Sequence, residues 1–365
     1  YPFIQTGDVK HAPLYLSTYT KTYSEEGLKQ SKLWKKGTLC ITIAANIADT
    51  AILDIDACFP DSVIGFVANE EVCDTKFIKY TFNTLQQQYK QFSQGAAQDN
   101  LSLEKLLSIK FKIPSLPVQQ KIAGILSAYD DLIDNNRKRI ALLEKAARLL
   151  YEEWFVRLQF PGHEHTPVVD GVPEGWEKCS AFDAVEVLSG GTPKTSEGRF
   201  WDGEIPFYTP KDSWGSIYAI DTLKNLTAEG LASCNSKLYP KNTLFITARG
   251  TVGNLNLAQR PMAMNQSCYA LRGKGNMSPL FLYLAMKDAV EVVKSKAVGS
   301  VFDAIVVDTF KQIPFLNPSS GIMDGFQSTI APIFNQVEIL MLQSIRLQAA
   351  RDLLLPRLMS GELAV

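Results

Sequence analysis

The sequence lacks the features that define several large classes of protein. It contains no apolar run near the roughly 18–20 residues that span a bilayer, and it does not open with a basic segment followed by an apolar one, as a signal peptide does. Its cysteines show no C-x-x-C spacing; they are Cys40, Cys58, Cys73, Cys179, Cys234 and Cys268. We therefore expect a cytoplasmic protein with no membrane partner, whose cysteines are small buried apolar groups in a reducing compartment.

An excess of positive charge is also absent. The 37 Lys and Arg residues are balanced by 38 Asp and Glu, which leaves a formal net charge of −1. Non-specific affinity for nucleic acid comes from neutralising phosphates with Lys and Arg. A DNA-binding protein of this composition should therefore bind weakly alone or use the positive surface of a partner. The length of 365 residues, 46% of them hydrophobic, predicts two or three folded domains.

An internal repeat of about 200 residues is the most informative feature that is present. Short matches recur in the same order in both halves of the chain. They pair Pro2-Phe3 and Asp8 with Pro206-Phe207 and Asp212, Glu26-Gly27-Leu28 with Glu229-Gly230-Leu231, Thr38–Thr42 with Thr243–Thr247, Ile113-Pro114 with Ile313-Pro314, and Ala146-Ala147-Arg148 with Ala349-Ala350-Arg351. The second copy has a preceding segment, Gly175–Gly203, for which the first has no counterpart. We expect that roughly 30 residues of the first copy precede Tyr1, if the duplication was complete.

Each copy is predicted to have a globular part and a helical tail. The β-branched runs Thr38–Ile43 and Thr243–Thr247 indicate buried strands. The segments Lys76–Phe92 and Leu280–Lys296 indicate helices that pack against these strands. Because prolines follow near residues 114–117 and 314–318, regular structure should be interrupted there before the tail begins.

The two tails are predicted to be amphipathic helices whose apolar residues alternate at spacings of three and four, as in a coiled-coil seam. The first seam is Val118, Ile122, Ile125, Tyr129, Leu132, Ile140, Leu143, Ala147, Leu150 and Trp154, and the second is Phe326, Ile330, Ile333, Val337, Leu340, Ser344, Leu347, Arg351, Leu354 and Leu358. The matching positions favour packing of the seams on each other over packing of each on its own domain. Polar Asn136, Ser344 and Arg351 can fix the register. The second helix is expected to start near Pro332 and to weaken by Pro356.

Several segments resemble those of type I restriction–modification specificity subunits. The resemblance covers essentially the whole chain. Its segments are Gly190–Lys194 with Trp201, Gly203 and Lys211-Asp212 for the opening of a target-recognition domain, Arg249–Gly253 and Asn265–Ser267 for later parts of that domain, Pro117–Ala123 for the central helical region, and Leu353–Leu358 with Ser360–Leu363 for the C-terminus. The first copy departs from the pattern, because it lacks the Gly-Gly-Thr-Pro segment and has Asn46-Ile47-Ala48 where the second has Arg249-Gly250-Thr251.

The resemblance implies a mixed α/β (α+β) fold with a pseudo-twofold internal repeat, in which two globular target-recognition domains are joined by two long antiparallel coiled-coil helices. The implied division is residues 1–116 for the first target-recognition domain, 117–160 for the central helical spacer, 161–319 for the second target-recognition domain and 320–365 for the C-terminal helical spacer. Each domain would read one half of a split, asymmetric target in double-stranded DNA, and the helices would set the gap between the halves. A spacing near one duplex turn is about 34–36 Å, which is comparable with the length of such helices.

The resemblance also implies partners. Two methyltransferase subunits would dock on the chain and bring S-adenosylmethionine, and motor–nuclease restriction subunits would bring ATP and Mg²⁺. The chain itself would then need no cofactor or metal and catalyse nothing. Basic surfaces on these partners would also account for DNA binding by a complex that contains a chain of net charge −1.

Polar residues in the expected loops are candidates for DNA contact. Arg and Lys pair with guanine O6 and N7, Asn and Gln pair with adenine N6 and N7, and hydroxyl groups anchor phosphates. The predicted set is Gln5, Lys10 and Asn46 in the first copy and Thr192, Lys194, Lys211, Arg249 and Thr251 in the second. Each of these residues could instead be a surface side chain or a turn cap.

Other patterns suggest chemistry but each has a simpler interpretation. Asp61, Asp74 and Lys76 have a loose nuclease-like spacing, which a solvated loop and a strand end explain better. The segment Asn317–Ser320 begins like an amino-methyltransferase motif but lacks the aromatic residue that stacks on a flipped base, so it is interpreted as a loop before a helix. His163 and His165 have no evident metal-binding partners and are interpreted as linker residues.

Three alternatives to a specificity subunit remain open from the sequence. The chain could be an assembly scaffold whose domains bind protein and not DNA. It could be an Mg²⁺-dependent nuclease that uses Asp74 and Lys76. It could also be a half-size subunit that must dimerise, although two complete helical tails in one chain disfavour that.

Overall fold

The computed structural model describes residues 1–43, 48–92, 103–108, 110–111, 113–213, 215–296 and 304–365. Contacts divide the chain into unit 1, residues 1–138 with 343–365, and unit 2, residues 139–342. The long helices α5 (Leu116–Tyr151) and α10 (Ser320–Met359) each begin in one unit and end in the other. We call residues 1–115 of unit 1 head one and residues 157–319 of unit 2 head two. The finer four-part division stays a prediction.

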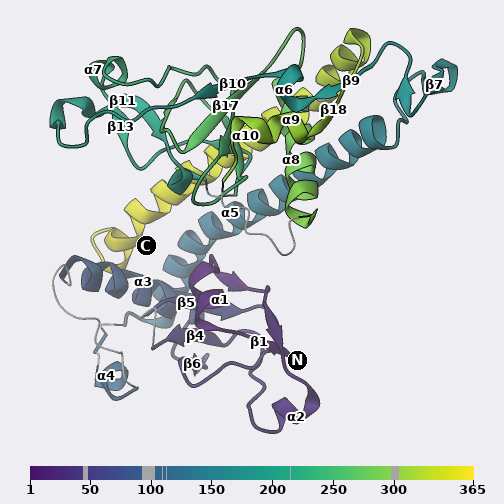
Figure 1. Cartoon of the computed structure of the whole chain (residues 1–365). Coiled ribbons are helices and arrows are strands. Elements are labelled where there is room, and N and C mark those ends of the chain that lie inside the picture. Colours follow the sequence, from purple (N-terminus) through teal and green to yellow (C-terminus); the bar gives the residue numbers. More distant parts are fainter. Residues whose placement is uncertain (44–47, 93–102, 109, 112, 214, 297–303) are drawn as a thin grey trace. The chain divides into compact units, whose positions relative to one another are not determined.

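Head one is a small sheet with a helix packed on it (Figure 1). The strand order is β2-β5-β4-β6, with β2 parallel to β5 and the other pairs antiparallel. Phe77 and Tyr80 of the helix α3 are buried together with Leu39 and Ile41 of the predicted strand β4. The elements are β1 (Pro2–Phe3), α1 (Thr6–His11), β2 (Tyr15–Leu16), β3 (Lys21–Thr22), α2 (Glu25–Leu28), β4 (Leu39–Thr42), β5 (Thr50–Leu53), β6 (Val63–Phe66), α3 (Thr75–Phe92) and α4 (Leu103–Ser108).

Head two contains the same core sheet together with further strands. Its main sheet has the order β10-β17-β14-β15-β12, and three smaller sheets have the orders β13-β11-β16, β18-β9 and β7-β8. The predicted strand and helix both form, as β14 (Leu244–Thr247) and α8 (Pro279–Lys296). The other elements are η2 (His163–His165), β7 (Val168–Val169), β8 (Val172–Pro173), β9 (Glu177–Ser180), α6 (Ala181–Ala184), β10 (Val185–Ser189), η3 (Gly198–Phe200), β11 (Trp201–Tyr208), η4 (Pro210–Asp212), β12 (Tyr218–Ala219), β13 (Asn225–Leu226), α7 (Ala228–Ala232), β15 (Leu255–Ala258), β16 (Ala263–Met264), β17 (Cys268–Gly273), α9 (Val307–Gln312) and β18 (Pro314–Asn317).

The repeat is visible in individual hydrogen bonds. After β1, the amide of Gln5 donates to the Asp8 carboxylate at 2.8 Å, and in head two the amide of Thr209 donates to Asp212 at 2.8 Å. Past β4, the Asp49 amide donates to the Thr42 hydroxyl at 3.1 Å. The equivalent bond past β14, from Asn254 to Thr247, is 3.0 Å long. Equal caps and strand registers at equal spacing confirm that the repeat is a duplicated domain.

The seam predicted for the first helix is wrong at Ile125 and Leu132, whereas Val118, Ile122 and Tyr129 are buried or half-buried as predicted. Ile125 and Leu132 are 39% and 48% exposed, whereas Leu126 and Asp130 are 0% and 1% exposed. A carboxylate is rarely buried, so the sequence pattern places Tyr129 in the seam and leaves out the neighbouring Asp130. From Ile140 onward the predicted residues are buried or half-buried, as is the whole second seam.

The second helix starts twelve residues earlier than predicted, at Ser320, and continues through Pro332 and Pro356 to Met359. A proline within a helix leaves the carbonyl four residues earlier without its donor. Here Pro332 and Pro356 are exposed. Ser328 and Asp352, whose carbonyls lie four residues before these prolines and lack their usual amide donors, are exposed too. Because water can reach both positions, the helix tolerates the two prolines.

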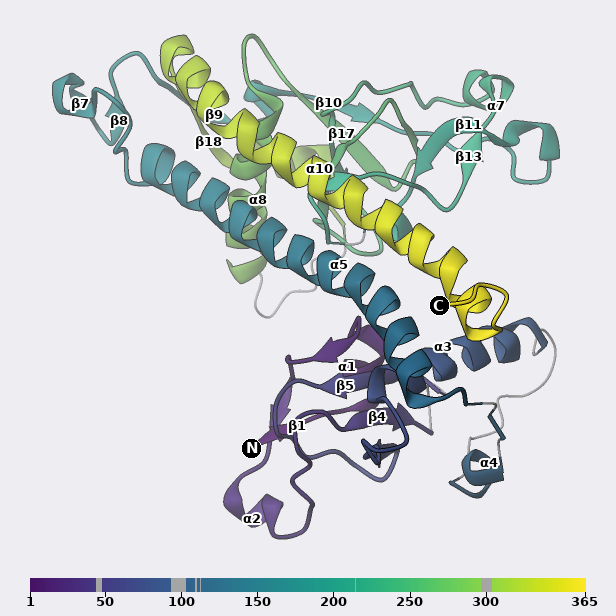
Figure 2. The same ribbon diagram turned by 180° about the vertical axis from the view of Figure 1, so that it is seen from behind.

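The polar seam residues bond between the helices, as predicted. In unit 1 the Asn136 amide donates to the Ser344 hydroxyl and to Gln343 Oε1, both at 3.3 Å. In unit 2 the rings of Trp154 and Phe326 lie with centroids 5.5 Å apart, where α5 and α10 run side by side (Figure 2).

In both units the two helices are antiparallel, and their seams pack on each other and also on the head of the same unit. In unit 1, Ile122 shares a cluster with Leu358 and Phe77. In unit 2, Phe326 shares one with Trp154 and Phe281.

The cysteines are less uniformly buried than expected. Cys40, Cys58 and Cys268 are buried, and burial raises the pKa of the Cys40 thiol to about 12. The other three are half-buried: Cys73 lies before α3, Cys179 lies in the two-stranded sheet of β9 and β18, and Cys234 lies after α7. Among the helices of the described residues, none combines the length and apolar character needed to span a bilayer.

Candidate functional site

Loops of head two that are far apart in sequence are joined at one end of the main sheet. The amides of Ala248 and Arg249 donate to the Ser267 carbonyl at 2.8 and 3.3 Å. The Thr192 hydroxyl donates to Oε1 of Gln266. The Thr251 hydroxyl donates to the Pro210 carbonyl, next to Lys211, at 3.4 Å. The predicted residues Thr192, Lys211, Arg249 and Thr251 are thus brought together with Gln266; we call these five residues the head-two loop cluster.

Glycines allow these loops to approach so closely. A Cβ on Gly190 would lie 2.2 Å from the Asn265 carbonyl oxygen, and one on Gly191 would lie 2.7 Å from the Asn235 amide nitrogen. Distances this short are impossible for a real side chain, so both positions require glycine. The Gly190-Gly191 pair therefore serves close backbone packing that places Thr192 in the cluster.

The cluster is cationic at its surface. Lys194, Lys211 and Arg249 are exposed, and within the described residues none of their side chains has an ion-pair partner. The neighbouring Asp212 is 1% exposed, and its carboxylate accepts hydrogen bonds from the Thr209 amide and hydroxyl and from the Leu223 amide. Free cations beside hydroxyl and amide groups are suited to phosphate and base contacts. Lys194 lies on the same loop as Thr192, and its carbonyl accepts from Trp201 Nε1 at 3.2 Å.

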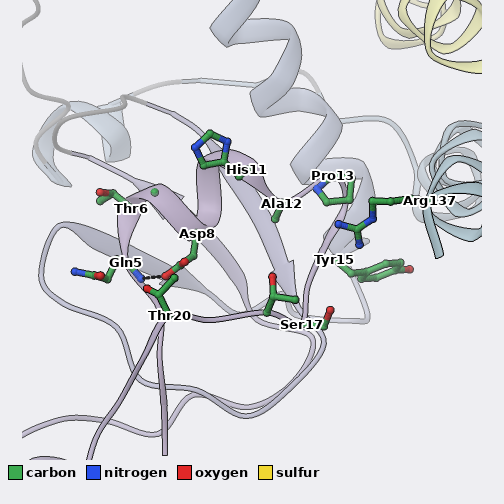
Figure 3. A pocket seen from close by; sticks show the side chains of 12 residues that line it. Gln5, Thr6, Asp8, His11, Ala12, Pro13, Tyr15, Ser17, Thr20 and Arg137 are labelled. Atoms are coloured by element: carbon green, nitrogen blue, oxygen red, sulfur yellow. Dashed lines mark hydrogen bonds between the residues drawn. The ribbon is translucent and has the colours of Figure 1, made fainter. Parts of the chain in front are cut away.

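Head one has a different polar surface, a pocket of about 440 Å³ beside α1 (Figure 3). Gln5 lines it, while Lys10 lies on the exposed surface of α1 and does not. Hydroxyl groups dominate the wall; the lining residues that carry them are Thr6, Tyr15, Ser17, Thr18 and Thr20. Arg137 extends into the lining from α5 and pairs with Asp134 at 2.7 Å.

Asn46 lies outside the described residues. The hydrogen bonds that pair Thr42 with Thr247 and Asp49 with Asn254 set the alignment of the two loops. Counted along the chain from these anchors, Asn46 corresponds to Thr251, and not to Arg249 as the sequence comparison had placed it. The sequence comparison misplaced Asn46 because residues 43–48 and 248–253, which lie between these anchors, are identical at no position.

Two candidate contact residues were missed from the sequence. Gln266 is exposed. It could have been found from the sequence, because it belongs to the Asn265–Ser267 segment, which resembles a later part of a target-recognition domain. Arg137 begins a run of three basic residues on α5, but nothing in the sequence indicates that this run meets head one.

The alternative chemistries have structural explanations. The Asp74 carboxylate accepts from the Phe77 amide at 2.8 Å and so caps α3, and Lys76 Nζ donates to the Ser127 hydroxyl at 3.3 Å. Asn317 ends β18 and Ser320 begins α10, as the loop interpretation predicts. His163 lies in a short 3₁₀ helix, with Nδ1 2.9 Å from the Phe160 carbonyl. A search of the described residues finds no group of three or more possible metal ligands.

Comparison with known proteins gives consistent relatives. The family described as type I restriction modification DNA specificity domain matches residues 1–145 and 173–348. The chain is 25% identical, over its whole length and 87% of the relative, to the type I restriction enzyme MjaIX specificity subunit of Methanocaldococcus jannaschii. It is 24% identical to the HindI specificity subunit of Haemophilus influenzae, over 74% of this chain and 72% of the relative. The crystal structure of a type I restriction–modification system S subunit from M. genitalium aligns with a TM-score of 0.60 at 16% identity, covering 98% of this chain and 88% of that one, which supports the fold.

Proposed function

The chain belongs to the family of type I restriction modification DNA specificity domains, and we propose that it is the subunit that selects the DNA target of such a system. It recognises an asymmetric target in two parts, one with each head. The observation that carries this proposal is the head-two loop cluster, where the cations of Lys211 and Arg249, which have no ion-pair partner among the described residues, accompany hydroxyl and amide groups on an exposed surface. Cations position the phosphate backbone, and side chains that reach base edges read the sequence.

The heads differ in how they would contact DNA. In head two, Thr192, Lys194, Lys211, Arg249 and Thr251 are the proposed contact residues. In head one they are Gln5, Lys10 and Asn46. Unequal heads reading unequal half-sites give a target without twofold symmetry, even though the scaffold is a repeat.

The chain is proposed to act as a non-catalytic part of a cytoplasmic complex. Two methyltransferase subunits supply S-adenosylmethionine, and restriction subunits supply ATP, Mg²⁺ and DNA cleavage. A net charge of −1 supports the need for such partners, because the chain alone cannot neutralise many phosphates.

The test is to co-express the chain with its candidate methyltransferase subunit and to map adenine methylation over random-sequence DNA. Two short half-sites around a fixed unspecified gap are the expected result. A co-purifying pair that methylates without sequence preference would contradict the proposal and favour an assembly scaffold. Mg²⁺-dependent cutting by the isolated chain, abolished in Asp74→Ala, would instead identify a nuclease.

A further inference from the structure

A buried carboxylate ties head one to both long helices. Asp130 of α5 is 1% exposed. One of its oxygens accepts from the Tyr80 hydroxyl of α3 at 2.5 Å, and the other pairs with the guanidinium of Arg351 on α10. Burial raises the pKa of Tyr80, so the phenol keeps the proton that it donates. Head one, α5 and α10 therefore meet at a single charged group.

Unit 2 contains a counterpart at the equivalent position of the other helix. Glu338 of α10 is 8% exposed, and its two oxygens lie 2.7 and 2.8 Å from Lys241 Nζ. Oε1 also accepts from Gln259 Nε2 at 2.9 Å. Lys241 precedes β14 and Gln259 follows β15, so Glu338 is bonded at the ends of two inner strands of the main sheet of head two.

Two glutamines establish that these carboxylates are equivalent. In unit 1, Gln119 Oε1 accepts from the amide of Asp74, the residue that caps α3, at 3.0 Å. In unit 2, Gln327 Oε1 accepts from the hydroxyl of Ser278, the residue that precedes α8. Asp130 and Glu338 follow their glutamines at the same interval along the helix. The glutamine contact is therefore the same in both copies, whereas the carboxylate contacts the helix α3 in unit 1 and the ends of β14 and β15 in unit 2.

The chemistry of the attachment allows little freedom. An apolar seam repeats every helical turn, so a head could shift by one turn and still bury its surface. A buried carboxylate has one position at which its partners satisfy it, and a shift would leave it desolvated and unpaired. The carboxylates thus select one placement among several that the apolar contacts permit.

We propose that Asp130 and Glu338 are positioning residues that fix each head at one point of its helix and thereby restrict the target to one gap length. This inference rests on the proposed function, because a gap has meaning only for a target in two parts. The two residues read no bases themselves. Their loss should therefore change the spacing of the half-sites and leave their sequences intact.

The experiment uses the full chain co-expressed with its methyltransferase subunit and random-sequence DNA, with Asp130→Asn and Glu338→Gln as variants. The wild type should methylate one gap length. Each variant should retain both half-site sequences and increase at least ten-fold the fraction of methylated sites whose gap is one or two base pairs shorter or longer, because one helical turn of about 5.4 Å spans between one and two duplex steps of about 3.4 Å. Asp130→Glu, which restores the charge, should recover part of the restriction. Asp131→Asn, an exposed carboxylate on the same helix, is the matched control and should keep the wild-type gap.

Either of two outcomes would overturn the inference. The variants could methylate with the gap distribution of the wild type, or they could lose methylation evenly over all sites while remaining folded by circular dichroism. If Asp130→Asn does not fold, the gap distribution of Glu338→Gln alone tests whether a buried carboxylate restricts the gap length. Absence of a two-part target in the wild type would count against the proposed function itself, so the two failures are distinguishable.

Discussion

Head one and head two share a backbone frame but differ at their surfaces. Both have a parallel strand beside an antiparallel pair, the same amide-to-carboxylate cap after the first strand, and the same threonine that closes the loop after the central strand. In the described residues, head two presents a cationic loop cluster, whereas head one presents a pocket lined in part by hydroxyl groups. The hydrogen bonds that determine strand register are thus retained in both copies, and the exposed residues that would contact DNA have diverged.

The close backbone packing at Gly190 of head two predicts the largest effect on stability. Gly190→Ala should destabilise unit 2 by about 3 kcal/mol or more, because its Cβ would overlap the Asn265 carbonyl, at 2.2 Å. Head one has no equivalent glycine in the described residues, so its half-site preference should persist. Urea unfolding and methylation mapping measure the two effects. The control is Gly198→Ala, where a Cβ would meet nothing within 4 Å; equal losses in both variants would contradict the packing argument.

The helices packed on the two sheets differ in charge. Lys79 of α3 is 3% exposed, and burial lowers its pKa to about 8 from the ordinary 10.5, while Tyr283, a neutral residue, occupies the corresponding position of α8. Below pH 8 the lysine is charged in both states, and the folded state bears the desolvation cost. Between about pH 8 and 10.5 the unfolded chain binds more protons, so stability should rise with pH.

Lys79→Met should remove that cost. We expect a gain of about 2 kcal/mol in the free energy of unfolding at pH 7, somewhat less than the pKa shift alone implies because the bond from Lys79 to the Pro13 carbonyl is lost. The rise in stability between pH 8 and 10.5 should disappear in urea titrations of the variant. A variant that keeps the wild-type pH dependence would assign that dependence to another group.

The loop cluster predicts a smaller and local effect. Arg249→Ala should relax one position of one half-site by about 1–3 kcal/mol of discrimination and leave the other half-site unchanged. Methylation mapping of the assembled complex measures both halves at once. A uniform loss of affinity over all sequences, with a reduced salt dependence, would instead assign Arg249 to a phosphate.

The smallest effect concerns one backbone angle that the two heads share. Ala48 has φ of +60° where head two has Gly253 with φ of +79°. A left-handed conformation costs an alanine roughly 1 kcal/mol that glycine avoids. Ala48→Gly should therefore stabilise unit 1 by about 1 kcal/mol and Gly253→Ala should destabilise unit 2 by a similar amount, as measured by urea unfolding. Opposite signs in the two heads are the essential result.

The sequence by itself determined the duplication, the central strand and packed helix of each head, and the existence of two long paired helices. These features depend on local patterns, namely β-branched runs, spacings of three and four, and matches in constant order. The candidate residues Thr192, Lys211, Arg249 and Thr251 were also found this way, although their proximity was not. Their loops meet only through backbone contacts that glycines 190 and 191 permit.

Only the tertiary structure decided which residues form the first seam, the path of α10 through Pro332, and the attachment of the heads. The predicted first seam leaves out Asp130, which is buried against Arg351, 221 residues away in the sequence. A carboxylate in a helix gives the local pattern of a solvent-facing residue, and nothing in that pattern reports a distant guanidinium. Hydrophobic periodicity describes what a segment prefers in isolation, whereas the position of a buried charge depends on which partner the completed fold brings to it.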